Sequence, residues 1–487
     1  MRRDCIEIRT YIIASLTLAA LTFFMPGTAR SEDGKAALSL EQCIGRAVEV
    51  NAEVKGAEFE AEVYRDKKEQ ADAARYPQGE VIAYGSLSPR ARLKNGSTIE
   101  STTNINKESY DGVFGRATVQ LIQPLYTFGK IKGYRDAASH GVAVYEAGAK
   151  LKATEVAMQV KEAYFGLLLA QETKGLIDEI KESINKATDK VQRQLDAGAP
   201  GVDQVDLFKL QTYQGEIDKY DAEAVEGMEK ARFGLMLLTD YKGKEEGFEI
   251  ADQFLIPDDL KVEDYVAYRD RAMGGRLEFQ QLKEGLLARE SLIAVELAEY
   301  YPQVFLAVFG SVAGATNRDH LNNPYVFDDY NHSVVGAVLG FKWSFDFGIH
   351  RGRLDEARAE YLKLKMKDLY AEGGVPFQVK DAHLQLKKSI EQMAALSRAY
   401  KTAKQWAVAS LSNFDMGVGE ARDIADSISA YARIRADYFR AVYNQKMAIA
   451  NLDHATGRDA VDIPYTVRTY PTRDIHIFDK VEKAGGI

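Results

Sequence analysis

The chain of 487 residues repeats itself once, and this duplication limits its possible folds more than any other feature. Four blocks recur in the same order: Tyr76-Pro77-Gln78 as Tyr301-Pro302-Gln303, Gly85-Ser86 as Gly310-Ser311, Phe128-Gly129 as Phe347-Gly348, and Gln159-Val160-Lys161 as Gln378-Val379-Lys380. One large repeat predicts two homologous halves rather than a solenoid, which needs several repeats. We place the halves at residues 38–240 and 255–457, followed by a tail at 458–487.

Each half contains a helical stretch far longer than a globular domain needs. The expected helices are Lys130–Asp196 and Ile349–Asp415, and about 67 residues at 1.5 Å per residue give a rod of about 100 Å. Helices of this length are typical of coiled coils and helical arrays. Gly373-Gly374-Val375-Pro376 should interrupt and kink the second rod.

Shorter helices complete each half. We expect an opening helix at Ser39–Tyr76 and another at Val262–Tyr300, ended by Pro77 and Pro302. Ser39 with Gln42 resembles a capping box. After each rod, glycine-rich turns predict a reversal into a returning helix. The returning helices are Val202–Thr239 and Ala421–Thr456.

Two strand-like segments lie between the opening helix and the rod of each half, at about residues 79–125 and 303–347. The expected strands are Glu80–Leu87, Val113–Leu121, Val304–Ala313 and Val335–Phe347. The second and fourth strands alternate apolar residues with polar or small ones, and the fourth ends in aromatics. This alternation is typical of a transmembrane barrel strand, although a half-buried soluble sheet shows it too. The polar segments 88–111 and 314–331 would then be long external loops.

Four strands cannot close a barrel, and an open sheet edge in lipid leaves backbone groups without hydrogen bonds. Several chains must therefore share one barrel. Three copies would supply twelve strands. The expected fold class is mainly α with a small β part, internally duplicated.

The N-terminus has the order of a secretory signal peptide. Arg2, Arg3 and Arg9 precede an apolar run at residues 11–24, and small residues follow up to Ala29. This run is shorter than the about 20 residues that a membrane-spanning helix needs. We therefore expect residues 1–29 to be removed on export.

Charge and motifs exclude several classes of function. The net charge is −9, from 63 basic and 72 acidic residues with no basic block, so nucleic acid is not an expected partner. We find no HExxH, CxxC, G-x-S-x-G or P-loop motif, and we expect no catalytic residues, cofactor or metal site. His320 and His332 fall in an expected external loop, where lone histidines are seldom ligands. Cys43, in an expected helix, is interpreted as a small core residue.

Three segments carry a resemblance to a known family. Gln123-Pro124-Leu125-Tyr126-Thr127-Phe128-Gly129-Lys130 turns from an expected strand into a rod, Gly417 is followed by Asp423-Ile424-Ala425-Asp426, and the last helix ends in Asn451-Leu452-Asp453-His454-Ala455-Thr456-Gly457. With the duplicated plan, these segments make residues 38–457 similar to the TolC-like outer membrane efflux family.

The resemblance implies a homotrimer with a shared twelve-stranded barrel in outer-membrane lipid and a long α-helical barrel across the periplasm of a Gram-negative bacterium. It implies docking on a periplasmic adaptor (a membrane fusion protein) and on an inner-membrane pump of the RND, ABC or MFS type. The implied function is an outer-membrane duct for tripartite efflux or type I secretion, without chemistry of its own.

Asp423 and Asp426 stand three residues apart on one helix face. Acidic residues at these positions in similar proteins form rings at the periplasmic mouth, whereas the plainer interpretation is a solvated acidic face. Some members also have a tyrosine and an arginine that tie the mouth shut. Here those positions hold Phe414 and Gly419, and Arg422 lies one turn on.

Glycines mark both ends of the rods. We expect Gly198, Gly201, Gly417 and Gly419 to form helix-turn tips that face an adaptor. The barrel-to-helix bends are expected at Pro124, Phe128, Gly129, Gly133, Phe347, Gly348 and Gly352, where glycine permits unusual backbone angles.

Two other classes stay open at this point. A periplasmic coiled-coil scaffold or adaptor that never enters a bilayer would need the strands to form a soluble sheet. A secreted enzyme would need a catalytic constellation, and the sequence offers none.

Overall fold

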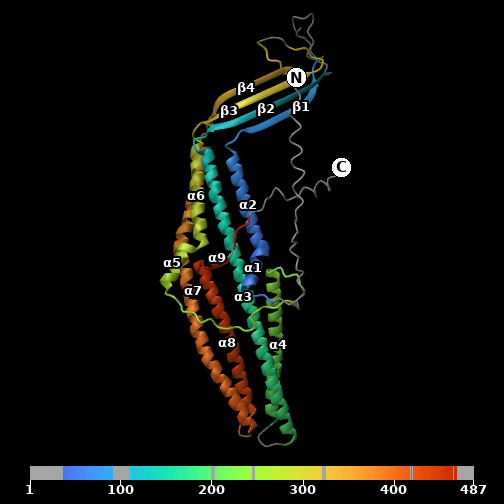
Figure 1. Ribbon diagram of the computed structural model, residues 1–487, viewed down its shortest axis with the longest axis vertical. Coiled ribbons are helices and arrows are strands. Elements are labelled where there is room, and N and C mark those ends of the chain that lie inside the picture. The colour runs from blue at the N-terminus through green and yellow to red at the C-terminus, as the bar shows by residue number, and fades with distance from the viewer. Residues whose placement is uncertain are drawn as a thin grey trace, which may run out of the picture.

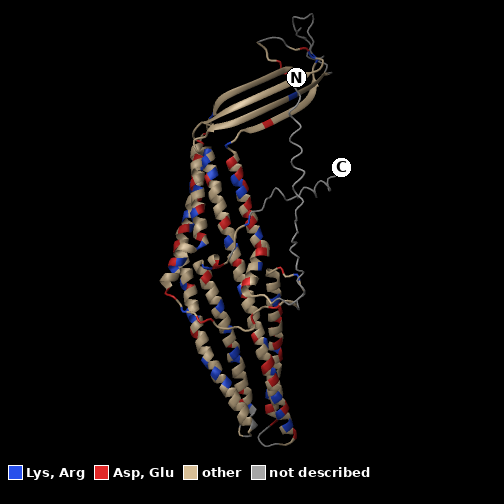
Figure 2. Cartoon of the chain, viewed as in Figure 1, with Lys and Arg blue, Asp and Glu red and all other residues tan. Residues whose placement is uncertain are grey.

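A computed structural model describes residues 37–90, 110, 112–198, 203–243, 247–320, 325–416, 418, 421–463 and 465–468. The expected signal segment 1–29 and most of the tail lie outside this range. A four-stranded sheet stands at one end of the molecule, and long helices run from it to two hairpin tips at the opposite end (Figure 1). Charged residues are spread along all the long helices, whereas the strands carry few (Figure 2).

The opening segment of each half is two helices, not the single helix expected from the sequence. In the first half, α1 (Leu40–Val50) and α2 (Ala52–Ala73) meet at Asn51, an extended residue with ψ 132°. Its side chain accepts a hydrogen bond from the Glu53 N–H at 2.8 Å, which competes with helical bonding. In the second half, α5 (Tyr265–Gly275) and α6 (Leu277–Ala298) meet at Arg276, with ψ 131°.

The capping and ending signals of these helices are confirmed. The Ser39 hydroxyl accepts from the Gln42 N–H at 3.3 Å, and the Gln42 side chain accepts from the Ser39 N–H at 3.0 Å. This reciprocal pair fixes the start of α1. Both α2 and α6 end a few residues before their prolines.

Both rods are confirmed at their expected bounds. They are α3 (Lys130–Asp196) and α7 (Ile349–Asp415), each of 67 residues. The returning helices are α4 (Gln204–Leu238) and α8 (Ala421–Thr456). The expected interruption of the second rod is wrong: α7 continues through Pro376 as one helix, and Figure 1 shows it bowed along its length. Within the described residues, no helix is both long and apolar enough to cross a membrane.

The helices associate as two hairpins, α3 with α4 and α7 with α8, and α3 also packs against α8. In the lower part of α3, the buried residues Leu176, Ile180, Ile184, Ala187 and Val191 recur every three or four positions. This spacing is the seam of a coiled coil. Burial along this seam holds each rod to its partners.

The sheet contains β1 (Gln78–Ser88), β2 (Gly112–Tyr126), β3 (Gln303–Ala315) and β4 (His332–Lys342) in that order, all antiparallel. Four strands were expected at these places. However, β4 ends at Lys342, so Trp343, Phe345 and Phe347 lie beyond it. The register shifts between Pro124 and Tyr126, where proline lacks a ladder donor.

Strand register sorts the side chains into two faces, because directly opposed residues share a face. One face carries mostly polar residues in β1 and β2, including Glu80, Tyr84, Ser86, Arg116, Thr118 and Gln120. The other face carries Val81, Val119, Leu121, Val308, Leu339 and Phe341. Most of these apolar side chains are exposed, Leu339 by 70%. Alternation in the second and fourth strands is therefore present as expected.

The C-terminal segment packs against the helices in the middle of the molecule. Short α9 (Asp459–Asp462) follows α8, and residues 465–468 run beside α1 and α2. The Tyr465 hydroxyl donates to the Glu58 carboxylate at 2.8 Å, and Arg468 pairs with Glu49 at 3.2 Å. Cys43 is fully buried in the neighbouring core, as expected for a small core residue.

An ion pair between His454 of α8 and Asp459 of α9 holds the two helices together and makes their contact sensitive to pH. His454 Nδ1 lies 2.7 Å from Asp459 Oδ2, and the hydrogen bond that the protonated ring donates to this carboxylate raises the pKa of His454 above its ordinary value of 6.5. Of the other charged groups, Glu278 also raises the pKa of His454, and Arg276 lowers it. Since the folded pKa is the higher one, the stabilisation is complete below about pH 6.5 and is lost as the pH rises through the folded pKa.

We therefore expect amide protection in residues 452–463 to fall as the pH rises from the ordinary pKa of 6.5 through the raised pKa of His454, after correction for intrinsic exchange rates. His454→Gln should remove this pH dependence. His320→Gln, at an exposed position, is the control and should behave as the wild type. An unchanged pH dependence in His454→Gln would contradict the assignment.

Candidate functional site

Both helical hairpins end at the same end of the molecule, opposite the sheet (Figure 1). After α3, Gly198 adopts φ +65°, a left-handed conformation that glycine tolerates without strain. Asp203 then starts α4 with a capping box, accepting from the Asp206 N–H at 3.0 Å. Gly198 thus has the cap conformation expected of it. Gly201, Gly417 and Gly419 lie outside the described residues.

Asp423 and Asp426 occupy the first two turns of α8, beside these tips, and both are exposed. Asp426 Oδ1 lies 2.9 Å from Lys209 Nζ on α4, so this carboxylate joins the two hairpins. Among the described residues, Asp423 has no ion pair. The two carboxylates share a face, but within the described part of the chain only the charge of Asp426 is offset by a neighbouring lysine.

Burial on the opposite face of α8 fixes the direction of these carboxylates. Ile424, Ala425 and Ile428 are buried in the cluster that fills the lower hairpins. Phe414 of α7 belongs to the same cluster, and Lys190 Nζ lies 4.6 Å from its ring centroid. Phe414 is therefore a core residue that also attracts a cation. Arg422 is exposed at the start of α8.

A second set of contacts joins the hairpins higher up, and sequence reasoning missed it. The Glu179 carboxylate of α3 pairs with Arg435 of α8 and accepts from the Tyr431 hydroxyl at 3.2 Å. Burial raises the pKa of Tyr431 to about 12, so its hydroxyl remains a donor. Tyr400 of α7 stacks on Tyr431 with a centroid distance of 5.9 Å. The available signal was weak: Tyr431 and Arg435 are four residues apart on one helix face.

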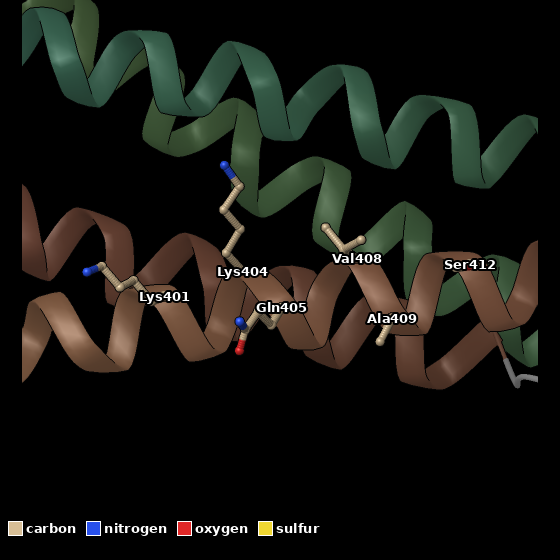
Figure 3. A pocket seen from close by; sticks show the side chains of 6 residues that line it. All are labelled: Lys401, Lys404, Gln405, Val408, Ala409 and Ser412. Atoms are coloured by element: carbon tan, nitrogen blue, oxygen red, sulfur yellow. The ribbon is translucent and has the colours of Figure 1, made fainter.

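The lower third of α7 bears a shallow groove of about 620 Å³. Its lining residues are Lys401, Lys404, Gln405, Val408, Ala409 and Ser412. In Figure 3, Lys404 and Val408 point from α7 toward the side on which the α3–α4 hairpin lies. The site thus combines exposed carboxylates near the tip with a lysine-lined groove farther along the rods.

Backbone conformation explains the strand-to-helix bends. Phe128 and Gly129 adopt φ 50° and 92°, and Gly348 adopts φ 144°. Phe128 also stacks on Tyr301 at 5.0 Å between centroids. Phe347 lies fully exposed beside Gly348, whose N–H donates to Asp346 Oδ1 at 2.9 Å.

Gly133 and Gly352 do not provide backbone freedom, contrary to expectation, because both lie inside helices without positive φ. A Cβ at Gly133 would lie 2.7 Å from Val295 Cγ2, so this glycine permits close packing of α3 on α6. At Gly352 a Cβ would meet nothing within 4 Å. Pro124 lies in β2, before the bend itself, at the register shift.

The two histidines expected in an external loop lie in different surroundings. His332 is the first residue of β4, not a loop residue, and its ring contacts Ser311 Oγ at 2.8 Å and the Asp328 carbonyl at 2.9 Å. His320 is exposed after β3. Among described residues, no group of three or more His, Cys, Asp or Glu side chains is placed to hold a metal ion.

Comparison with known proteins identifies similar molecules. The family model described as "Outer membrane efflux protein" matches residues 43–207 and 269–458. The solved structure of CusC aligns with a TM-score of 0.69 at 16% identity, covering 86% of this chain and 92% of CusC. The CmeC outer membrane channel of Campylobacter jejuni gives 0.68 at 14%, covering 91% of this chain and 88% of CmeC.

The open state of the MtrE outer membrane channel of Neisseria gonorrhoeae is similar to the same degree. Its TM-score is 0.68 at 17% identity, and the alignment covers 86% of this chain and 88% of MtrE. A search of curated protein sequences finds no match. At these identities the solved structures show a shared fold, whereas the family match covers most of the sequence itself.

Proposed function

The chain belongs to the outer membrane efflux protein family, whose members are trimeric outer-membrane channels of efflux systems, and from this premise we propose how its parts form the duct. As a member, it is a transport channel located in the outer membrane. The finer proposals concern which parts of the chain meet lipid, which line the pore and which meet partner proteins.

We propose that the sheet forms one third of a twelve-stranded barrel. Its apolar face, with Val81, Leu339 and Phe341 exposed, would meet lipid, and its polar face would line the water-filled pore. The edge strands β1 and β4 would pair with those of neighbouring copies, because unpaired edges are not tolerated in lipid. The exposed apolar face on an otherwise charged molecule carries this proposal.

The helical rods would extend the pore into the periplasm. At about 100 Å they are long enough to carry a pore well beyond the membrane. The two hairpin tips would meet a periplasmic adaptor of an RND, ABC or MFS pump. One tip contains Gly198, and the other contains the exposed side chains of Met416 and Val418. Substrates would pass through without covalent chemistry on this chain.

We propose that Asp423 and Asp426 line the inner mouth of the pore. In a trimer each position would occur three times, and carboxylates around a narrow pore concentrate negative potential and favour cations. Both side chains are exposed, and they point away from the core of the hairpins because Ile424 and Ala425 face that core. Both observations support this role. The coiled-coil scaffold alternative, with a soluble sheet, is not favoured by the family match.

The mass of the protein in a detergent extract of purified outer membranes tests the proposed assembly. We expect a particle of about three chains, which requires detergent and not salt alone for release. Leu339→Asp, on the proposed lipid face, should reduce insertion, and Gln120→Asp, on the pore face, should not. A monomer, or release by salt, would contradict the shared barrel.

A further inference from the structure

The polar face of the sheet is covered at the end farthest from the helices. Phe114, on this face, is only 7% exposed, and Ser88 beside it is fully buried. Farther along the same face, Glu80 and Gln120 are exposed. If this face lines a water-filled pore, something must enter the pore at its outer mouth and cover Phe114.

The covering segment is residues 325–331, the second of the two described stretches of the β3–β4 connection. The Tyr330 ring meets the Phe114 ring edge to face, with 5.1 Å between centroids. Asp329 Oδ1 lies 3.4 Å from the Arg116 guanidinium, and the Asp329 carbonyl accepts from the same group at 3.2 Å. Arg116 also donates to the Tyr84 hydroxyl at 3.3 Å. Three pore-face residues of β1 and β2 thus contact or support this segment.

The segment is held in a defined conformation. Asp328 Oδ1 accepts from the backbone N–H groups of Tyr330 and Asn331 at 3.0 and 3.2 Å. Asn331 Oδ1 accepts from the Ala315 N–H at 2.9 Å, and the ring centroids of Phe327 and His332 lie 4.7 Å apart. These bonds join the segment to both strands that it connects, so the inward direction of Tyr330 follows from the turn.

The Arg318 side chain packs over the Tyr330 ring. The Arg318 guanidinium carbon lies 3.9 Å from the Tyr330 ring centroid, and its Nη1 donates to the Pro89 carbonyl at 3.3 Å. Tyr330 is therefore enclosed between Phe114 on the sheet and Arg318 above it. The ring is part of a packed cluster rather than a free loop side chain.

We propose that residues 325–331 fold into the outer mouth of the duct and narrow it, with Tyr330 and the Arg116–Asp329 pair setting the opening. The proposal rests on the assignment of the polar face to the pore. In a trimer, three copies of the segment would converge at this level and form a second constriction, at the opposite end from the Asp423 mouth. This constriction would restrict what enters from outside.

Reaction of a cysteine inside the pore with reagents added outside tests the proposal. Gln120→Cys places a thiol on the pore face below Arg116, and the only other cysteine outside the signal segment, Cys43, is buried. In cells that express the full chain, we expect Gln120→Cys to react with a small sulfonated thiosulfonate but slowly with a bulky polyethylene-glycol maleimide. Tyr330→Ala should raise the rate with the bulky reagent about threefold to tenfold, since one aromatic contact no longer holds the segment inward.

The charge pair gives an independent variant. Asp329→Arg should also raise the rate with the bulky reagent, and the exchange Arg116→Asp with Asp329→Arg should restore the slow rate. Val326→Ala, at an exposed position in the same segment, is the matched control and should have no effect. In a separate series without Gln120→Cys, the bulky reagent should label Tyr325→Cys, 94% exposed, and this labelling measures how much of each variant is displayed on the cell surface.

Two outcomes separate this inference from the channel function. Equal and fast reaction of Gln120→Cys with the bulky reagent in all variants would overturn the constriction and leave the duct intact. No reaction with the small reagent in any displayed variant would mean that Gln120 does not face a pore, and the proposed barrel orientation would fail as well.

Discussion

Replacing Asp423 and Asp426 together by asparagine is expected to lower the cation-to-anion permeability ratio of the channel on the order of tenfold, the scale on which a charged constriction concentrates ions. The reason is that six carboxylates would leave a narrow mouth in a trimer. Asparagine keeps the size and most of the hydrogen bonding, so the trimer should still assemble. Reversal potentials in planar bilayers under a salt gradient measure the ratio.

The two carboxylates should not contribute equally. Asp426 lies 2.9 Å from Lys209, whereas Asp423 has no ion pair among the described residues. Because Lys209 offsets much of the Asp426 charge, Asp423→Asn alone should cause the larger loss of selectivity. Lys209→Gln should raise cation selectivity and loosen the contact between α4 and α8.

Asp437→Asn is the matched control, since it removes one exposed carboxylate from α8 about 20 Å from the tip. Screening over this distance should leave little effect on selectivity at the mouth. An equal loss in Asp437→Asn would show that the whole pore, not the ring, sets selectivity. Unchanged selectivity in the double variant would remove Asp423 and Asp426 from the mouth.

The rods were predictable because their signals are local. The bounds of α3 and α7 follow from the Phe-Gly turns before them and the glycine turns after them, and the coiled-coil seam follows from spacing along one helix. Pro376 was misleading: a proline removes one donor, but the surrounding seam of Val375, Val379 and Leu386 keeps α7 helical. Tertiary packing outweighed the local cost.

The helix breaks at Asn51 and Arg276 could not be predicted in the same way. The Asn51 break has no glycine or proline beside it. Gly274 and Gly275 directly precede Arg276 and are a local signal, but the Arg276 break also involves contacts distant in sequence. Arg276 donates to Gln378 Oε1 at 2.7 Å, and a Cβ on Gly457 would lie only 3.1 Å from the Gly275 carbonyl. Only the assembled fold brings these groups together.

The candidate site also contains some residues that local spacing predicts and others that only contacts distant in sequence bring together. Asp423 and Asp426 are recognised by spacing from Gly417, which is a local pattern. The bridge from Glu179 to Arg435 joins residues 256 apart, and nothing in the sequence pairs them. The inward segment with Tyr330 is hidden for the same reason, because Arg116 and Asp329 are 213 residues apart.

Replacing Gly133 by leucine is expected to destabilise the chain by about 3 kcal/mol, at the upper end of what overpacking costs. A Cβ there would lie 2.7 Å from Val295 Cγ2 and 3.0 Å from the Ser291 carbonyl, and Val295 is almost fully buried. The backbone of α6 cannot move aside without disturbing its packing on α3. Thermal unfolding of the detergent-extracted protein, with the yield of assembled particles, measures the loss.

Gly352→Leu is a control supplied by the duplication itself, because Gly352 is the repeat equivalent of Gly133 and a Cβ there meets nothing within 4 Å. In the isolated chain this change should gain up to about 1 kcal/mol from helix propensity. If Gly352→Leu blocks assembly while the chain stays folded, a neighbouring copy packs on α7 at this point. If Gly133→Leu is as stable as the wild type, the packing of α3 on α6 does not require a glycine at position 133.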